Sequence, residues 1–295
     1  MDIRSKITRR TLTTALLAAT LVSVAGAAVA TEPYPGKIIV KKWYDRNADG
    51  IWQITEPSLS NWPMTLTPPG TTQLTVAGVT TFANLTPGTY SVLEGVPIET
   101  NWFQSAPRSN GTILNPVTLY VGSYQTKTIK FGNYCKKPSG GRTPGFWSNP
   151  NGEARINDGA TGAAPELALL SSLNLVDGAG NPFDPTTYAE FDTWLLNGNA
   201  TNMAYMLSVH LAAMTLNVEA NFVNPNAFYI PAGSTIGALL DAADAALAAD
   251  GLTLAGDPNR AGQEELKNAL DALNNGALIV PTTPTGCPRT FYTPY

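Results

Sequence analysis

The residues best suited to chemistry form a short acidic loop near the start of the chain. Asp45, Asn47 and Asp49 alternate with other residues, Gly50 follows directly, and Glu56 closes the stretch. This spacing fits the calcium loop in which alternate side-chain oxygens turn inward, glycine permits the sharp turn and glutamate supplies two oxygens. The alternative is a solvated turn that holds no ion. The sequence predicts a Ca2+ site with these ligands: Asp45, Asn47, Asp49, the carbonyl of Ile51, Gln53 directly or through water, and Glu56.

The residues around this loop predict strands, whereas an EF-hand requires helices on both sides. The segment before the loop, 37–44, is rich in β-branched and aromatic residues and has no helical periodicity. Similar short runs follow, separated by proline, glycine and asparagine, at 62–67, 72–76, 79–82, 89–94, 117–121 and 126–131. Regularly spaced short strands of this kind are typical of a β-sandwich.

Several motifs of this β-region occur in a characteristic order. They are Trp43-Tyr-Asp-Arg-Asn-Ala-Asp-Gly50, Glu56-Pro57, Phe82-Ala-Asn-Leu-Thr-Pro-Gly-Thr-Tyr90 and Phe131-Gly-Asn133. In order and spacing they resemble the B-type repeat of serine-aspartate-repeat surface proteins (the SdrD B-like domain), a relative of the Cna B and prealbumin-like modules. The resemblance spans about residues 35 to 134. It implies an Ig/prealbumin-like sandwich that is stiffened by calcium and serves as a spacer or adhesive module in secreted and surface proteins.

The same resemblance raises the question of a covalent crosslink. Some Cna B relatives carry an isopeptide bond between a lysine and an asparagine, formed with the help of a glutamate. Glu94 and Asn133 lie where that glutamate and asparagine are expected. Alignment on the calcium loop places Val40 at the lysine position, with Lys41 and Lys42 one and two residues further on. The sequence leaves open whether a crosslink forms.

The first thirty residues predict export. Basic residues at positions 4, 6, 9 and 10 precede an apolar run that ends in Ala28-Val-Ala30, which is the pattern of a signal peptide over residues 1–30. The general secretory route is favoured and a twin-arginine route is the alternative. No later stretch is long and apolar enough to span a membrane. We therefore expect a secreted protein, extracellular or at the cell surface, with no transmembrane segment in the mature chain.

The character of the sequence changes after the β-region. Residues 136–145 are rich in proline, glycine and serine, and helix signals follow. The predicted organisation is a β-sandwich at 31–134, a linker at 135–145 and an all-α helical domain at 146–295. About five helices are expected, near 163–173, 186–196, 203–218, 234–247 and 257–273, with Asp184, Ser234 and Asp257 as N-caps.

The two cysteines bracket the predicted helical domain. Cys135 follows the sandwich and Cys287 lies near the C-terminus. Because an exported protein with an even cysteine count normally oxidises its thiols, we predict a disulfide between them. The alternative is a pair of free or intermolecular thiols.

Charge is distributed unevenly along the chain. Residues 31–142 carry ten Lys/Arg against six Asp/Glu, whereas residues 143–286 carry three against fifteen. Neither half has a basic patch interleaved with aromatic residues, so nucleic acid is not an expected partner. The acidic half either keeps the protein soluble or attracts the basic half, within one molecule or between copies.

Catalytic motifs are scarce. His210, the one histidine, falls on an apolar helix face, where a hydrogen-bonded core residue is favoured over a general base. The carboxylate pairs Asp241/Asp244 and Glu264/Glu265 are candidates for a hydrolase only because such an enzyme needs two carboxylates. We therefore predict that the protein is not an enzyme.

Aromatic residues in predicted loops offer one further possibility. Trp52, Trp62 and Trp102 are candidate glycan contacts, because an exposed indole stacks on the apolar face of a sugar ring. The favoured interpretation is a secreted or cell-surface structural or adhesive protein. A secreted carbohydrate-binding module is the alternative, and a hydrolase ranks third. The expected partners are calcium, and extracellular matrix, a glycan or further copies of the chain.

Overall fold

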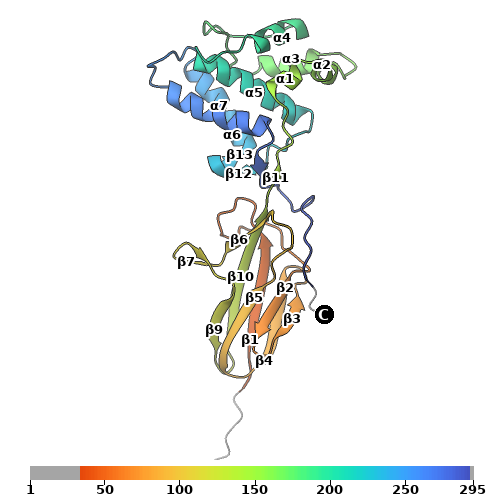
Figure 1. Ribbon diagram of the computed structural model, residues 1–295, viewed down its shortest axis with the longest axis vertical. Coiled ribbons are helices and arrows are strands. Elements are labelled where there is room, and N and C mark those ends of the chain that lie inside the picture. The colour runs from red at the N-terminus through yellow and green to blue at the C-terminus, as the bar shows by residue number, and fades with distance from the viewer. Residues whose placement is uncertain (1–33, 293–295) are drawn as a thin grey trace, which may run out of the picture. The chain divides into compact units, whose positions relative to one another are not determined.

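Two four-stranded sheets pack face to face in the first part of the protein (Figure 1). The computed structural model describes residues 34–292, so the predicted signal peptide lies outside the described residues. One sheet has the order β4-β1-β10-β6, formed by Val79–Leu85, Gly36–Tyr44, Thr126–Cys135 and Trp102–Ala106. The other has the order β3-β2-β5-β9, formed by Thr71–Leu74, Pro63–Thr67, Gly88–Glu94 and Val117–Val121. A β-sandwich is therefore present, as the sequence predicts.

Alternation of side chains explains why these segments form strands. In β1, Ile38 and Val40 are buried, Lys37 is exposed and Ile39 is half-buried. Successive strand residues point to opposite faces, so one face of each strand enters the core. Burial of each large apolar side chain contributes roughly 1.5–3 kcal/mol.

The first and last long strands are neighbours. β1 and β10 run parallel in the middle of their sheet, with Lys42 opposite Phe131 and Tyr44 opposite Asn133. Parallel strands need a long connection, which the other sandwich strands supply.

The remaining short strands are β7 (Arg108–Ser109), β8 (Thr112–Ile113), β11 (Lys137–Pro138), β12 (Phe228–Tyr229), β13 (Ser234–Thr235) and β14 (Leu278–Ile279).

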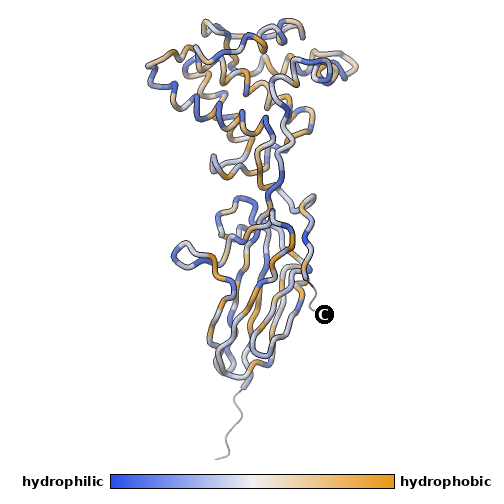
Figure 2. Tube along the Cα trace, viewed as in Figure 1, coloured by the Kyte–Doolittle hydropathy of each residue, from blue (hydrophilic) through white to orange (hydrophobic). Residues whose placement is uncertain are grey.

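The helices share a second hydrophobic core, which is distinct from that of the sandwich. They are α1 (Pro144–Trp147), α2 (Pro150–Ile156), α3 (Ala164–Ser171), α4 (Tyr188–Leu196), α5 (Met203–Glu219), α6 (Ile236–Ala249) and α7 (Arg260–Asn274), with a 3-10 turn η1 (Ile230–Ala232). α5 is buried on nearly every side, whereas hydrophilic and hydrophobic residues follow one another along α7 (Figure 2). The helix expected near each predicted position is present, and the short α1 and α2 are additional.

The predicted N-caps are wrong for three helices. Thr187 is the N-cap of α4, through a capping box with Glu190, and lies three residues after Asp184. Thr235, one residue after Ser234, caps α6, because its hydroxyl accepts a hydrogen bond from the N–H of Ala238. α7 begins at Arg260, because the carboxylate of Asp257 accepts a hydrogen bond from the backbone of Asn259 and forms a turn before the helix.

The segment predicted as a linker is held by hydrogen bonds. Cys135 ends β10, and β11 pairs antiparallel with β14. The Ser139 hydroxyl donates to the Leu273 carbonyl at 2.6 Å. The side-chain amide of Asn217 bonds both the N–H and the carbonyl of Arg142, at 2.9 and 2.8 Å. The proline, glycine and serine content therefore correctly indicates a connecting segment, but this segment is fixed by hydrogen bonds to the helical region.

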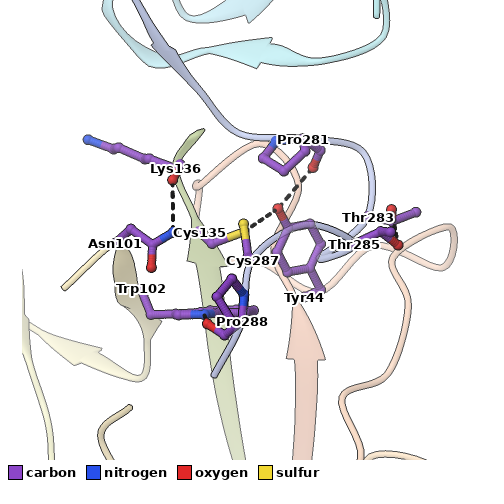
Figure 3. The surroundings of a disulfide bond; sticks show 10 residues. All are labelled: Tyr44, Asn101, Trp102, Cys135, Lys136, Pro281, Thr283, Thr285, Cys287 and Pro288. Atoms are coloured by element: carbon purple, nitrogen blue, oxygen red, sulfur yellow. Dashed lines mark hydrogen bonds between the residues drawn. A yellow bond between two sulfur atoms is a disulfide. The ribbon is translucent and has the colours of Figure 1, made fainter. Parts of the chain in front are cut away.

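The disulfide between Cys135 and Cys287 is present (Figure 3), which confirms the sequence prediction. The Cα atoms of the two cysteines are 6.4 Å apart, and the cysteines are separated by 152 positions in the sequence. The hydroxyl of Tyr44, at the end of β1, donates to the Pro281 carbonyl at 2.9 Å beside this bond.

None of the helices in the part of the chain described by the structure is both long and apolar enough to cross a membrane.

Loss of the disulfide should destabilise the helical region. In the chain-entropy model, a loop of this length raises the free energy of unfolding by about 5 kcal/mol at most. We expect the double variant Cys135→Ser/Cys287→Ser to lose its helical circular dichroism at a lower denaturant concentration than the oxidised protein. The reduced wild type serves as the control and should follow the double variant. Equal midpoints for all three proteins would contradict the prediction.

A buried lysine, glutamate and asparagine form the candidate functional site

Three polar side chains meet inside the sandwich at one end. Lys42 is near the end of β1, Glu94 is the last residue of β5, and Asn133 is near the end of β10. Each continues the series of inward-facing positions of its strand, which explains why it enters the core. Their exposed fractions are only 0%, 2% and 4%.

The three side chains are in direct contact. Lys42 Nζ donates to Asn133 Oδ1 at 2.5 Å and to the Phe131 carbonyl at 3.3 Å. The same nitrogen is 3.4 Å from Glu94 Oε1. The other oxygen of Glu94, Oε2, is buried with no hydrogen-bond partner among the described residues. An amine, an amide and a carboxyl group with a spare oxygen are thus held together.

The surrounding backbone fixes these positions. The amide of Asn115 accepts from the Glu94 N–H at 2.8 Å and donates to the Glu94 carbonyl at 2.9 Å. The carbonyl of Asn133 accepts from the N–H of Asp45 at 2.9 Å. Because Lys42 and Asn133 sit on paired strands and Glu94 sits on the facing sheet, their separations are set by the sheet register and by the packing of the two sheets.

An aromatic wall keeps water away from the amine. Lys42 Nζ is 4.2 Å from the ring centroid of Trp62, which is fully buried. Trp102 packs edge-on against Trp62 at 5.3 Å, and the Trp62 indole N–H donates to the Gly95 carbonyl at 2.8 Å. In this dry setting, uncharged forms of acids and bases are favoured.

Burial changes the protonation of the pair. Desolvation lowers the pKa of Lys42 to about 8, against the opposing attraction of Glu94. Desolvation raises the pKa of Glu94 to about 7, against the attraction of Lys42. The two pKa values thus approach one another. Burial therefore favours the neutral amine beside the neutral acid over the ion pair, in comparison with the same two groups in water.

This arrangement is suited to amide exchange. A neutral Lys42 Nζ can attack Cγ of Asn133 while the acid form of Glu94 protonates the amide. The carboxylate then takes a proton from Nζ and passes it to the leaving nitrogen, and Glu94 recovers its own proton from the oxygen as the carbonyl forms again. The Nζ–Cγ bond forms, the Cγ–Nδ2 bond breaks and ammonia departs, so Glu94 is regenerated and no other reactant is required.

The alternation of side chains along β1 is the sequence signal that selects Lys42, and not Lys41, as the buried lysine. Ile38, Val40 and Lys42 share one face, so the alternation that buries the first two also buries the third. Lys41 faces the other way, with its Nζ 5.7 Å from the Trp52 ring centroid. Alignment on the calcium loop expects the reactive lysine at the position of Val40. Lys42 is two residues further along β1 and therefore lies on the same face of the strand.

The predicted calcium loop adopts a tight acidic turn directly after β1. Asp45 is fully buried, and its two carboxylate oxygens accept from the N–H groups of Asp49 and Gly50, at 3.2 and 2.7 Å. Gly50 has a φ of +78°, and a Cβ there would lie 2.8 Å from the Ser105 carbonyl, so only glycine fits. Glu56 turns back over the loop and accepts from the N–H groups of Arg46 and Gln53.

The loop meets some requirements of a calcium site and not others. Gln53 Oε1 is buried without a partner among the described residues, as suits a ligand. Burial raises the pKa of Glu56, with a smaller contribution from the carboxylates of Asp45 and Asp49, against two backbone hydrogen bonds. Within residues 34–292, however, no group of three His, Cys, Asp or Glu side chains is close enough to hold a metal. The donor set therefore fits calcium only after the carboxylates turn toward one centre, and the site stays a prediction.

The structure corrects two of the candidate glycan contacts. Trp62 is fully buried and Trp102 is 7% exposed, because the C-terminal segment covers both. Neither indole face is open to a sugar ring. Trp52 is half-buried and stacks on Trp43 with ring centroids 5.7 Å apart. A sugar platform made of all three residues is thus excluded by packing.

The other catalytic candidates from the sequence are His210 and the carboxylates of the helical region. His210 is buried on α5, with Nδ1 3.8 Å from Asp271 Oδ1 and no hydrogen-bond partner at that nitrogen among the described residues. Desolvation lowers the pKa of His210, against the attraction of Asp271. The Asp244 carboxylate accepts two hydrogen bonds from Asn174, while Glu264 and Glu265 are exposed.

Comparison with known proteins gives only distant similarities. No family model matches the chain, and no curated protein sequence matches it. Solved structures that are similar to part of it include GBS52, the minor pilin of Streptococcus agalactiae, with 13% identity, a TM-score of 0.24, and coverage of 34% of this chain and 44% of that one. The Bacillus anthracis TIE protein has 15% identity, a TM-score of 0.24 and coverage of 35% and 17%. BcpA, the major pilin subunit of Bacillus cereus, has 17% identity, a TM-score of 0.21 and coverage of 34% and 30%. The chain thus spans less than half the length of each.

Removal of calcium should lower the melting temperature of the sandwich if the loop binds the ion. A site with a Kd of roughly 0.1 mM would contribute about 1.4 kcal/mol at 1 mM calcium. We expect Glu56→Gln to abolish the calcium-dependent rise in melting temperature, measured by calorimetry with and without chelator. Glu153→Gln, which removes the same charge from an exposed position on α2, is the control. An unchanged calcium response in Glu56→Gln would refute the site.

Proposed function

We propose that this is an exported structural or adhesive protein of the cell surface, whose β-sandwich is closed by a covalent bond between Lys42 and Asn133. The observation that carries the proposal is the buried contact of the Lys42 amine with the Asn133 amide, beside a Glu94 carboxyl group that has a free oxygen. Burial of a lysine and a glutamate costs desolvation free energy, and a functional role would explain why the fold retains them. The sequence resemblance to B-type surface modules and the predicted signal peptide support the same function.

The position of the bond supports a role under tension. Lys42 and Asn133 lie on the first and last strands of the sandwich, so a bond between them bypasses residues 43–132. The disulfide from Cys135 to Cys287 then bypasses residues 136–286. Only Asn133, Tyr134 and Cys135 separate the end of the first bypass from the start of the second. A pulling force on the two ends of the chain would therefore run through covalent bonds past both the sandwich strands and the helices.

The helical region is free for another task under this arrangement. Because it lies outside the path of the force, it can be displayed without being unfolded by tension. Its acidic composition, set against the basic residues 31–142, supports attraction between copies of the chain, and we include self-association in the proposal. Calcium at the loop after β1 would stiffen the sandwich beside the crosslink, as part of the same function.

The crosslink should be visible as a loss of mass. We expect the folded protein, denatured for intact-mass spectrometry, to be lighter than its sequence by one ammonia beyond the disulfide hydrogens. Lys42→Arg and Glu94→Gln should keep the full mass, and Asn133→Asp should lose water in place of ammonia. Lys41→Arg is the matched control and should crosslink normally. A wild-type protein that folds and keeps its full mass would overturn the proposed function.

Single-molecule stretching tests the bypass. When the oxidised chain is pulled from residue 34 and from its C-terminal end, neither bypassed segment should lengthen. Glu94→Gln should release residues 43–132, which adds roughly 300 Å, and reduction of the disulfide should release residues 136–286, which adds roughly 500 Å. If the oxidised wild type extends by both amounts, tension does not run through these bonds.

A further inference from the structure

The last described residues return to the sandwich and cover the end that holds the site. After Cys287, the carbonyl of Pro288 accepts from the Trp102 indole N–H at 2.9 Å, and Figure 3 shows Pro288 beside that ring. Thr290 accepts from the N–H of Ile98 at 2.8 Å. The backbone N–H and the hydroxyl of Thr290 both donate to the Glu99 carboxylate, each at 2.7 Å. The segment is thus fixed to the loop between β5 and β6.

Two side chains of this segment reach the aromatic wall of the site. Phe291 packs edge-on against Trp62 with ring centroids 5.1 Å apart. The Arg289 guanidinium carbon is 5.5 Å from the ring centroid of Trp62 and 5.8 Å from that of Trp102. A guanidinium N–H of Arg289 donates to the Ser60 carbonyl at 2.8 Å. Since Trp62 also contacts the Lys42 amine, the segment is separated from the reacting nitrogen by one indole ring.

We propose that residues 287–292 are a lid that closes the Lys42–Glu94–Asn133 site, and that Arg289 is a positioning residue that acts on Lys42 through Trp62. This inference rests on the proposed crosslink. Without the lid, Trp62 and Trp102 lose a covering layer and water gains access to the amine. An amine in contact with water holds its proton, and a protonated amine cannot attack the amide.

The charges around the amine favour the same outcome. Glu94 from β5 and Asp45 from the acidic loop attract a proton to Lys42, while Arg289 from the lid repels it. Arg289 is the one cation among these neighbours. Its guanidinium stays charged in proteins and stacks on aromatic rings, so it supplies a fixed positive charge at the wall of a dry site.

The disulfide anchors the lid. Cys287, the first residue of the lid, is bonded to Cys135, which lies two residues after Asn133 on β10. Oxidation therefore holds the lid at the end of the strand that carries the reacting amide. It follows that the disulfide should form first and the crosslink should form rapidly only afterwards, which restricts the crosslink to an oxidising compartment.

The rate of ammonia loss during refolding tests the lid. Uncrosslinked chain, recovered in guanidinium from insoluble protein and starting at residue 31, is diluted into oxidising buffer, and samples are quenched in acid for intact-mass spectrometry. We expect Arg289→Ala, Glu99→Ala and Cys135→Ser/Cys287→Ser each to crosslink at least about tenfold more slowly than the wild type, the change produced by one unit of pKa in the amine. Arg289→Lys should recover part of the rate. Arg142→Ala, which removes an arginine stacked on Phe146 and Phe222, is the matched control.

The pH profile separates a lid from a general loss of folding. The crosslinking rate should be bell-shaped in pH, because the reactive pair holds one proton. Opening the lid stabilises the ion pair, so in Arg289→Ala the maximum should fall while the acid limb moves to lower pH and the basic limb to higher pH. Circular dichroism checks that each variant folds. Equal rates and profiles in wild type and Arg289→Ala would overturn the lid, whereas absence of ammonia loss from the wild type would overturn the crosslink itself.

Discussion

Burial of Lys42 with Glu94 and Asn133 is the constraint on which the rest of the structure depends. An amine and a carboxyl group inside a core oppose folding unless they are neutral, paired or consumed. The sandwich provides for all three, since it removes water, places the groups 3.4 Å apart and brings the amine to an amide. A covalent bond would remove the amine permanently and convert a costly pair into a fixed strand connection.

The surrounding features are arranged about this contact. The acidic loop begins where β1 ends and is hydrogen-bonded to the backbone of Asn133. The disulfide starts two residues beyond Asn133 on the same strand. The lid crosses the tryptophans that line the amine. The end of the sandwich from which the chain leaves is therefore reinforced by side-chain contacts, by one disulfide and, in our proposal, by a second covalent bond.

Each reinforcing feature joins parts of the chain that are remote in sequence. Lys42 and Asn133 belong to the first and last strands of the sandwich along the chain, and Cys135 is bonded to a residue near the C-terminus. Such connections restrict the unfolded chain more strongly as the enclosed loop grows. They also determine which residues bear tension, which is a mechanical property that hydrophobic packing alone does not provide.

Local sequence was sufficient for seven of the eight sandwich strands, the five longer helices, the acidic turn and the paired cysteines, because each depends on periodicity, on turn residues or on counting. It missed β6, which pairs with the end of β10. It also contained the choice of Lys42 over Lys41, since alternation along β1 buries every second residue. Only the tertiary structure decided which polar groups meet. The separation of Lys42, Glu94 and Asn133 depends on sheet order and register, and the burial of Trp62 and Trp102 depends on a segment almost two hundred residues away. Those distances arise from long-range packing, which no local pattern encodes.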